Sequence, residues 1–343
     1  MKVVHFESGL GNQMLDYVDY LLVKRAYPLH EVFAERLVFD IVDSHQVISM
    51  WNGFELDRVF GLDLPDIRTL FDERRWRLVK EGIVRSRFWE NGWSYSEDLV
   101  ALFSSQGLAL QNSIRRRRPL SSSKPSLVGR LRDVTKNTRL GGEIRCAIQS
   151  VLADPEEDHI LYGAVEGDEL CGHSLMGMYK GYGIDGIRDE LLRDFRFPPF
   201  RNDENRQMEE LLAGRNAVAI HARRGDYIGV NGFCYKNGYF ERATRLVKKS
   251  VESPLFVFFS DPSGLPWIMS NLGTFGLDAK RDELIVVDWN VGPESYRDMQ
   301  LMSLCKHNIF TQSSFGWWGG YLNDNPNKIT VAPSKSIVAT HCR

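Results

Sequence analysis

The sequence lacks the features that would place this chain in a membrane, on nucleic acid or around a structural metal ion. It has no apolar run near the roughly 18 residues of a transmembrane helix, and its net charge of −2 does not indicate a nucleic-acid partner. The five cysteines are scattered without C-x-x-C spacing, so we interpret them as reduced thiols. With 43% apolar and 26% charged residues, the composition is that of a soluble globular protein.

The length of 343 residues suits two domains better than one core. Hydrophobic periodicity breaks at residues 195–200, where two prolines interrupt the pattern. We therefore expect an N-terminal domain over residues 1–200 and a C-terminal domain over residues 201–343. The first apolar run is interrupted by Glu7, which argues against a secretory signal.

The most informative motif follows a short β-branched run at residues 218–220 and contains His221, Arg223, Arg224 and Asp226. Open α/β sheets bind ligands at the carboxyl ends of their strands, and the guanidinium fork suits phosphate oxygens. The motif therefore predicts a site for a phosphorylated or diphosphate ligand. The alternative is a surface turn with an internal Arg–Asp salt bridge.

Two further segments share this design of a strand followed by a polar turn. Residues 255–261 form an apolar run that ends in a serine and Asp261, and residues 307–310 are expected to form a strand before the turn 311–316. A helix is expected from Trp317, so Ser313 and Ser314 would lie beside free backbone N–H groups that attract anions. Three strand ends of the C-terminal half thus indicate a nucleotide-sized ligand.

In the N-terminal half we expect a strand at residues 3–6, a glycine turn at residues 9–13 and a helix at residues 14–24. Asn12 and Gln13 would then face a cleft between the domains; the alternative is a tight turn with ordinary polar residues. Residues 181–186 match a dinucleotide-binding fingerprint, but no clean β-branched strand precedes them, so we do not interpret them as such a site.

Four motifs in this order resemble glycosyltransferase family 11, the GDP-fucose-dependent alpha-1,2-fucosyltransferases. They are Gly-Leu-Gly-Asn-Gln at 9–13, His-Ala-Arg-Arg-Gly-Asp-Tyr at 221–227, Phe-Ser-Asp at 259–261 and the segment 301–322. The resemblance implies an α/β fold with two Rossmann-like domains facing across a cleft, of the GT-B type. It also implies an inverting transferase that needs no metal and no cofactor, with GDP-fucose as a substrate. Animal members usually carry an N-terminal membrane anchor, so its absence implies a cytoplasmic enzyme of bacterial type.

The resemblance also implies roles for individual residues. Arg223 would stabilise the departing diphosphate, which needs fixed positive charge and N–H groups, and Asp261 would accept hydrogen bonds from guanine. His221 would contact the ribose or guanine. The other donor-binding candidates are Arg224, Ser313, Ser314, Phe315, Gly11 and Asn12, and the acceptor-side candidates are Asn12 and Gln13. No Asp-x-Asp pair occurs, so the metal clamp of many nucleotide-sugar transferases is missing.

The proton acceptor for the sugar hydroxyl is less clearly marked. The alpha-1,6-fucosyltransferases, which share the arginine motif, place a glutamate where this chain has Asn231. Asp226 is the nearest carboxylate in the arginine motif, and it would act either as the base or as a partner of the arginines. Asp16 or Asp19 is the alternative base, and a dissociative transition state needs no strong base.

A basic segment at residues 113–145 departs from the family pattern, with a local net charge of about +8. It predicts contact with anionic lipid, and so a location at the inner face of the membrane, or with a lipid-linked acceptor; the alternative is a solvated loop. The sequence thus predicts transfer of fucose to O2 of galactose in an oligosaccharide or lipid-linked glycan. Two alternatives remain open: another GDP-sugar or linkage on the same fold, and a non-catalytic glycan-binding protein.

Overall fold

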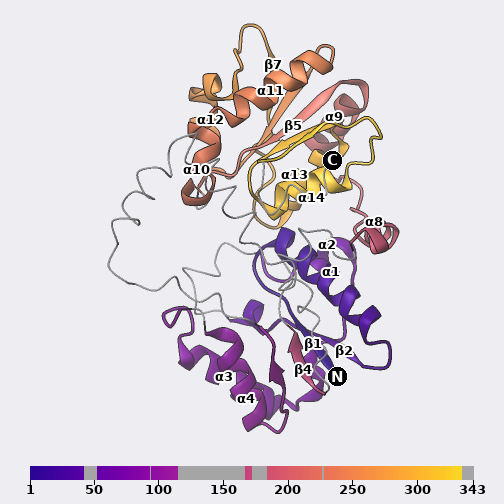
Figure 1. Ribbon diagram of the computed structural model, residues 1–343, viewed down its shortest axis with the longest axis vertical. Helices are drawn as coiled ribbons and strands as arrows, with labels where there is room; N and C mark the ends of the chain where they lie inside the picture. Colours follow the sequence, from indigo (N-terminus) through magenta and orange to yellow (C-terminus); the bar gives the residue numbers. More distant parts are fainter. Residues whose placement is uncertain (42–51, 93, 115–166, 172–183, 226–227, 334–343) are drawn as a thin grey trace, which may run out of the picture. The chain divides into compact units, whose positions relative to one another are not determined.

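The computed structural model describes residues 1–41, 52–92, 94–114, 167–171, 184–225 and 228–333. These residues form two units, the first ending at Arg196 and the second beginning at Phe197. Each unit has its own β-sheet, and every strand pair in both sheets is parallel (Figure 1). An α/β fold with two Rossmann-like units is therefore confirmed.

The sheet of the first unit has the strand order β2-β1-β4-β3. Its central strand β1 is buried along its whole length, as parallel strands covered on both faces must be. The strands are β1 (Lys2–His5), β2 (Val32–Glu35), β3 (Gln111–Asn112) and β4 (Glu169–Cys171). The α-helices are α1 (Leu10–Ala26), α2 (Leu56–Phe60), α3 (Glu73–Ser86), α4 (Tyr95–Ser105) and α8 (Arg188–Asp194), with 3-10 turns at Leu37–Asp40, Ile67–Leu70 and Asp185–Ile187.

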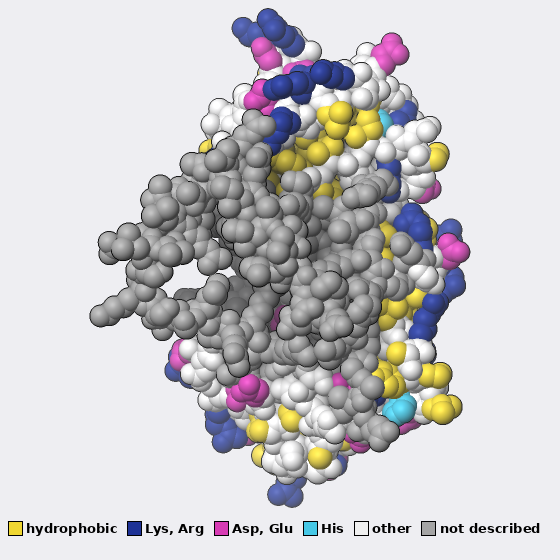
Figure 2. Space-filling model, viewed as in Figure 1, with side chains coloured by type: hydrophobic (Ala, Val, Ile, Leu, Met, Phe, Trp, Pro, Cys, Tyr) yellow, Lys and Arg dark blue, Asp and Glu magenta, His cyan; other side chains and the backbone are white. Residues whose placement is uncertain are grey.

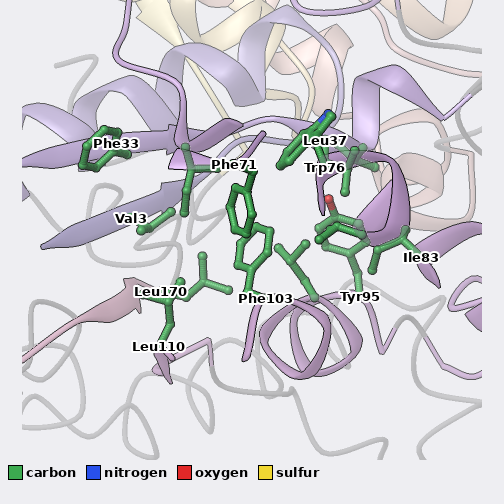
Figure 3. Packing of buried hydrophobic residues seen from close by; sticks show 14 of the residues in the cluster. Val3, Phe33, Leu37, Phe71, Trp76, Ile83, Tyr95, Phe103, Leu110 and Leu170 are labelled. Carbon is green, nitrogen blue, oxygen red and sulfur yellow. The ribbon is translucent and has the colours of Figure 1, made fainter. Parts of the chain in front are cut away.

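An aromatic cluster forms part of the core of the first unit (Figure 3). The ring of Phe71 lies 5.2 Å from that of Phe103 and 5.7 Å from that of Trp76, measured between centroids. Trp76 shares the buried face of α3 with Val79 and Ile83, at helical spacing. Such rings bury large apolar areas and stabilise the packing of α3 and α4 on the sheet.

The sheet of the second unit has the strand order β7-β6-β5-β8-β9. Its strands are β5 (Ala217–His221), β6 (Leu255–Phe259), β7 (Glu283–Val286), β8 (His307–Phe310) and β9 (Thr330–Val331). The α-helices are α9 (Asp203–Gly214), α10 (Ile228–Lys236), α11 (Tyr239–Ser250), α12 (Leu265–Ser270), α13 (Tyr296–Leu304) and α14 (Ser314–Leu322), with 3-10 turns at Leu272–Phe275 and Gly292–Glu294. The chain builds outward from β5 through β6 to β7 and then returns to β8 on the other side of β5.

Helices cover both faces of this second sheet (Figure 1). Val218 and Ile220 of β5 pack in one cluster with apolar residues of α11 and α12. Phe310 of β8 lies against Gly316 and Gly320 of α14. The unit is thus doubly wound, which makes the point where the strand order reverses, between β5 and β8, the expected ligand site.

Helix starts differ most from the sequence-based expectation. The strand at residues 307–310 is confirmed, but α14 begins at Ser314 rather than Trp317. The first helix begins at Leu10 rather than Met14, so Gly11, Asn12 and Gln13 form its first turn instead of a glycine loop.

Charged side chains of both signs are interspersed over the described surface on the face shown in Figure 2, in keeping with the balanced composition. Among the helices of the described residues, none has the length and apolar character needed to cross a bilayer.

Candidate functional site

The site in the second unit is built where β5 and β8 end side by side. Backbone N–H of Thr311 donates to the carbonyl oxygen of His221 over 3.1 Å, and the hydroxyl of Thr311 accepts a bond from the backbone N–H of Arg223, also over 3.1 Å. The turn after β8 is therefore held by hydrogen bonds to the start of the arginine motif. This edge is the switch point of the sheet, so both turns face the position where doubly wound sheets bind nucleotides.

Helix α14 starts at this edge and packs closely on His221. Ser313 is its N-cap residue and has an extended backbone. A Cβ atom at Gly316 would lie 2.4 Å from Nδ1 of His221, so glycine is required for this approach. The first backbone N–H groups of a helix lack partners within the helix and favour anions; the phosphate-binding role expected of Ser313 and Ser314 stays a prediction.

His221 is buried, and its Nδ1 has no hydrogen-bond partner among the described residues. Burial, followed by the positive charge of Arg223, lowers the pKa of His221 to about 3, against the opposing charge of Asp261. The imidazole is thus neutral at physiological pH. Among the described residues that follow β5, the arginines carry the positive charge.

The two arginines are held in different surroundings. The guanidinium of Arg224 stacks over Trp267, with 3.7 Å to the ring centroid, and lies 5.3 Å from the ring centroid of Tyr235. Arg223 instead exerts its charge on His221, at the switch point. The donor-binding roles expected of Arg223 and Arg224 stay predictions, and Asp226, expected as the base or as a partner of the arginines, lies outside the described residues.

Asp261 braces the loop that carries the arginines. Its Oδ1 accepts from the backbone N–H groups of Arg224 and Gly225, each over 2.9 Å, and its Oδ2 accepts from the hydroxyl of Ser263 over 2.6 Å. Burial opposes ionisation, but these hydrogen bonds lower the pKa of Asp261 and keep it charged. The expected contact with guanine remains a prediction and would have to use the remaining acceptor capacity of Oδ2.

Glycines at Gly225 and Gly264 make this brace possible. A Cβ atom at Gly225 would lie 2.8 Å from Oδ2 of Asp261, and one at Gly264 would lie 2.5 Å from the hydroxyl oxygen of Ser260. That hydroxyl donates to the carbonyl oxygen of Ala222 over 2.6 Å. The loops after β5 and β6 are therefore tied to each other, and the glycines of the motif have a packing reason.

Gln13 in the first unit is used by the fold. Its side chain is buried, donates to the carbonyl oxygens of Ser8 and Gly53 over 2.9 Å each, and accepts from the backbone N–H of Glu55 over 2.7 Å. Both amide donors are thus occupied, which corrects the expectation that they reach an acceptor sugar. Asn12 is half-buried in the first turn of α1.

The N-terminus of α1 is closed to anions. The carboxylate of Glu55 is hydrogen-bonded to the backbone N–H of Leu10, and Glu55 is buried. Burial raises the pKa of Glu55 in spite of this bond and the nearby charge of Arg58. A phosphate would have to displace a carboxylate from this helix end, which disfavours an anion site at the start of α1.

Sequence reasoning overlooked Thr311, Trp267 and Tyr235, which position the arginine motif, and a buried group around His5 and Glu35 at the strand ends of the first unit. The available signal for the second group was a titratable residue at the end of each of two buried strands. The basic segment lies outside the described residues from residue 115 onward, as do residues 181–183 of the dinucleotide-like fingerprint. Among the described parts of the chain, no three His, Cys, Asp or Glu side chains group as metal ligands.

The fold and the site of the second unit define a doubly wound α/β unit with an arginine-lined switch point. Residues 187–339 match the sequence model of glycosyl transferase family 11. This match covers 153 of the 343 residues, so the resemblance to that family is found in the C-terminal part of the chain.

Three relatives show what the chain is similar to. It is 28% identical over 151 residues to an alpha-1,2-colitosyltransferase of Escherichia coli, with 42% of this chain and 49% of that protein covered. It is 32% identical over 161 residues to the O-antigen biosynthesis glycosyltransferase WbnK of Escherichia coli, with 44% and 51% covered. It is 27% identical over 148 residues to galactoside alpha-(1,2)-fucosyltransferase 1 of Oryctolagus cuniculus, with 40% and 38% covered. The matches span about half of each of the two bacterial proteins.

Among solved structures, the NodZ alpha-1,6-fucosyltransferase soaked with GDP-fucose superimposes with a TM-score of 0.45 at 11% identity, covering 94% of this chain and 91% of that chain. A similarity of this size carries no argument about this chain. The assignment of fold rests on the two parallel sheets.

Proposed function

We propose that this protein transfers L-fucose from GDP-fucose to a glycan hydroxyl, O2 of a galactose residue, with inversion and without a metal ion. The observation that carries the proposal is the switch point of the second unit, where Arg223 and the start of α14 flank the ends of β5 and β8. The names of two of the relatives give the same linkage, alpha-1,2, for two different sugars.

The chemistry asked of this edge is stabilisation of a departing diphosphate. The acceptor oxygen attacks the anomeric carbon as the bond from that carbon to the phosphate oxygen breaks, and the electron pair leaves with GDP. Charge therefore builds on the β-phosphate, where the guanidinium of Arg223 and the N–H groups at the start of α14 would stabilise it. Removal of one such preorganised donor lowers kcat by roughly 10²- to 10³-fold in other enzymes.

The first unit is assigned to the acceptor. Its corresponding helix N-terminus is occupied by Glu55, and its strand ends carry Glu7 and Glu35, with Arg36 after Glu35 paired to Asp66. The carboxylates at this edge can accept hydrogen bonds from sugar hydroxyls, which are neutral.

A second candidate donor is another GDP-sugar, because one relative is named for colitose rather than fucose. Both donors would use the same arginine edge. They differ only in the hydroxyl pattern of the sugar, so the donor has to be identified by turnover.

The test is incubation of the full chain with GDP-fucose and a panel of galactosides in EDTA, followed by NMR of the product. We expect GDP release and an alpha-1,2 linkage that persist under chelation. Activity lost in EDTA and restored by Mg²⁺ or Mn²⁺ would remove the metal-free mechanism. Turnover with a different GDP-sugar alone would select the second candidate, and glycan binding without GDP binding would identify a glycan-binding protein.

Asp261→Asn tests the guanine contact without removing the brace. The asparagine carbonyl can still accept from Arg224 and Gly225, but one carboxylate oxygen becomes a donor. We expect the preference for GDP over UDP to narrow in calorimetric titrations. An unchanged preference would limit Asp261 to holding the loop.

A further inference from the structure

A hollow lined by basic side chains opens on the surface of the first unit beside α3. Its volume is about 500 Å³, and its lining comes from α3, from the 3-10 turn Ile67–Leu70 and from the end of the 3-10 turn Leu37–Asp40. Four basic side chains and two carboxylates line it, which leaves two net positive charges; the basic residues are Arg68, Arg74, Arg77 and Lys80. The charge of the hollow therefore favours an anion.

The spacing along α3 explains why three of these cations lie together. Trp76 belongs to the buried face of the helix, so the opposite face meets solvent. Arg74, Arg77 and Lys80 follow at intervals of three residues, which places neighbouring side chains one helical turn apart. Arg74 and Arg77 are exposed and Lys80 is half-buried. These three residues are called the cationic face of α3 below.

The floor of the hollow is held in place by the core. Trp76 lines the hollow but is only 6% exposed, because its ring packs beside those of Phe71 and Phe103 (Figure 3). One of the two lining carboxylates is already paired, since the guanidinium of Arg68 donates to Oε1 of Glu73 over 2.8 Å. An anion in the hollow would thus meet the cationic face of α3 on a packed support.

The cationic face differs from the other arginines of α3, which have protein partners. Arg75 donates to the carbonyl oxygen of Gln106, and the guanidinium of Arg85 lies 4.0 Å from the carboxylate of Glu81. The side chains of the cationic face make no hydrogen bond or ion pair with another residue in the part of the chain that the structure describes. Like charges one turn apart on a helix repel each other, so the stability of α3 does not explain this arrangement.

Two exposed leucines lie next to these cations. Leu70 ends the 3-10 turn that carries Arg68 and is 37% exposed. Leu78 lies one helical turn after Arg74 and is 38% exposed. Cations beside exposed apolar side chains are typical of a surface that binds a lipid bilayer, because headgroup phosphates meet the cations while the apolar side chains enter the acyl boundary. A site for a soluble phosphate does not need the leucines.

We propose that this surface binds anionic phospholipid, with headgroup phosphates in the hollow and Leu70 and Leu78 against the acyl chains. The guanidinium forks of the cationic face would hold phosphate oxygens, and its lysine would add a point charge. The inference goes beyond the proposed function and does not depend on it. It also differs from the contact predicted for residues 113–145, because residues of α3 and of two 3-10 turns form the surface.

The test is sedimentation of the full chain with vesicles of phosphatidylcholine, with and without phosphatidylglycerol. We expect binding that needs the anionic lipid and weakens as salt screens the charges. Arg74→Gln, Arg77→Gln and Lys80→Gln combined should lower the partition coefficient about 10²-fold, since each basic residue at an anionic surface contributes roughly fivefold. The melting temperature should stay within error of the parent. Parent-like binding by this variant, or a parent that does not bind these vesicles, would overturn the proposal.

The matched control removes the same charges from another helix. Arg242→Gln, Arg245→Gln and Lys249→Gln combined neutralise two arginines and one lysine at exposed positions of α11. We expect this variant to bind the anionic vesicles within a few-fold of the parent. An equal loss in both variants would show that net charge decides binding and that the hollow does not.

Leu70→Gln and Leu78→Gln combined separate a bilayer from a soluble phosphate. We expect weaker binding to the anionic vesicles, and calorimetry with glycerol phosphate should show no binding to the parent. Unchanged vesicle binding in this variant, together with glycerol phosphate binding that needs the cationic face, would identify a soluble ligand and overturn the membrane contact. GDP affinity should be the same in the parent and in all three variants, so a failure here leaves the proposed function untouched.

Discussion

The two units end their central strands in the same way but with opposite chemistry. His5 ends β1 and His221 ends β5, and both side chains are buried. The pKa of His5 is raised to about 9 by Glu35 and Glu7 in spite of burial, while burial and Arg223 lower the pKa of His221 to about 3. Burial is common to both, so the neighbours decide which histidine carries charge.

This difference extends to the whole edge of each sheet. The second unit presents arginines, a neutral imidazole and a helix N-terminus, which suit a diphosphate. The first unit presents carboxylates and an Arg36 that is paired with Asp66, and the N-terminus of α1 is occupied by Glu55. One fold repeated in one chain can thus end its strands in different chemistry, depending on the few residues that follow each strand.

The largest expected effect is the separation of the two histidine titrations. In NMR of labelled imidazoles, His5 should stay protonated up to about pH 9 and His221 should stay neutral down to about pH 3. Glu35→Gln should lower the pKa of His5 and leave that of His221 unchanged. If both histidines titrated near the ordinary pKa of 6.5, the contrast between the strand ends of the two units would be wrong.

The same pKa values fix opposite pH dependences of stability. The raised pKa of His5 contributes to the free energy of unfolding. This contribution is complete below pH 6.5 and is lost as pH rises through about 9. The lowered pKa of His221 gives the reverse, because stability is lost as pH falls from 6.5 toward about 3. Denaturant unfolding of His5→Gln and His221→Gln across pH should flatten the alkaline and acidic slopes respectively.

The next largest effect, a loss of kcat, is expected from substitution of Arg223 at the strand ends of the second unit. Lysine keeps the charge but loses the planar fork, so Arg223→Lys should resemble Arg223→Ala more than the parent. We expect kcat to fall by about 10²-fold or more with little change in melting temperature. Near-normal turnover in the lysine variant would show that the guanidinium is not needed for the departing diphosphate.

A moderate loss of stability is expected from Gly316→Ala. The new Cβ would lie 2.4 Å from Nδ1 of His221 and 3.0 Å from Cβ of Phe310, so α14 or the imidazole has to move. Overpacking of this kind costs about 1–3 kcal/mol, which denaturant titration can measure. Gly214→Ala in α9 is the control, since a Cβ there meets nothing within 4 Å, and it should be neutral or stabilising. Equal free energies of unfolding for the two variants would mean that α14 is not tightly packed against His221.

Much of the fold could be predicted because buried parallel strands are short apolar runs. The strand β8 was predicted at its observed bounds, and β6 lies within the predicted run. The helix starts were missed because the decisive contacts are not local. Helix α1 begins at Leu10, and the backbone N–H of Leu10 is hydrogen-bonded to Glu55, which lies 45 residues further along the chain.

The sequence indicated the candidate site residues that directly follow strands. It did not indicate the residues that hold these side chains and loops in position. Arg223 and Ser313 could be chosen from their position after β5 and β8. The brace by Asp261 and the stacking of Arg224 on Trp267 depend on which loops meet, which spacing along one segment does not reveal.

The smallest expected effect separates the two arginines within the cationic edge. Arg224 is stacked on Trp267 and lies near Tyr235, and a planar guanidinium stacks on aromatic rings better than an ammonium does. Arg224→Lys should therefore lower stability by about 1 kcal/mol while kcat stays within a few-fold of the parent. Thermal melts and kinetics beside Arg223→Lys provide the matched comparison, since that variant should show the opposite pattern. A large loss of kcat with an unchanged melting temperature in Arg224→Lys would assign the diphosphate to Arg224 and reverse the two roles.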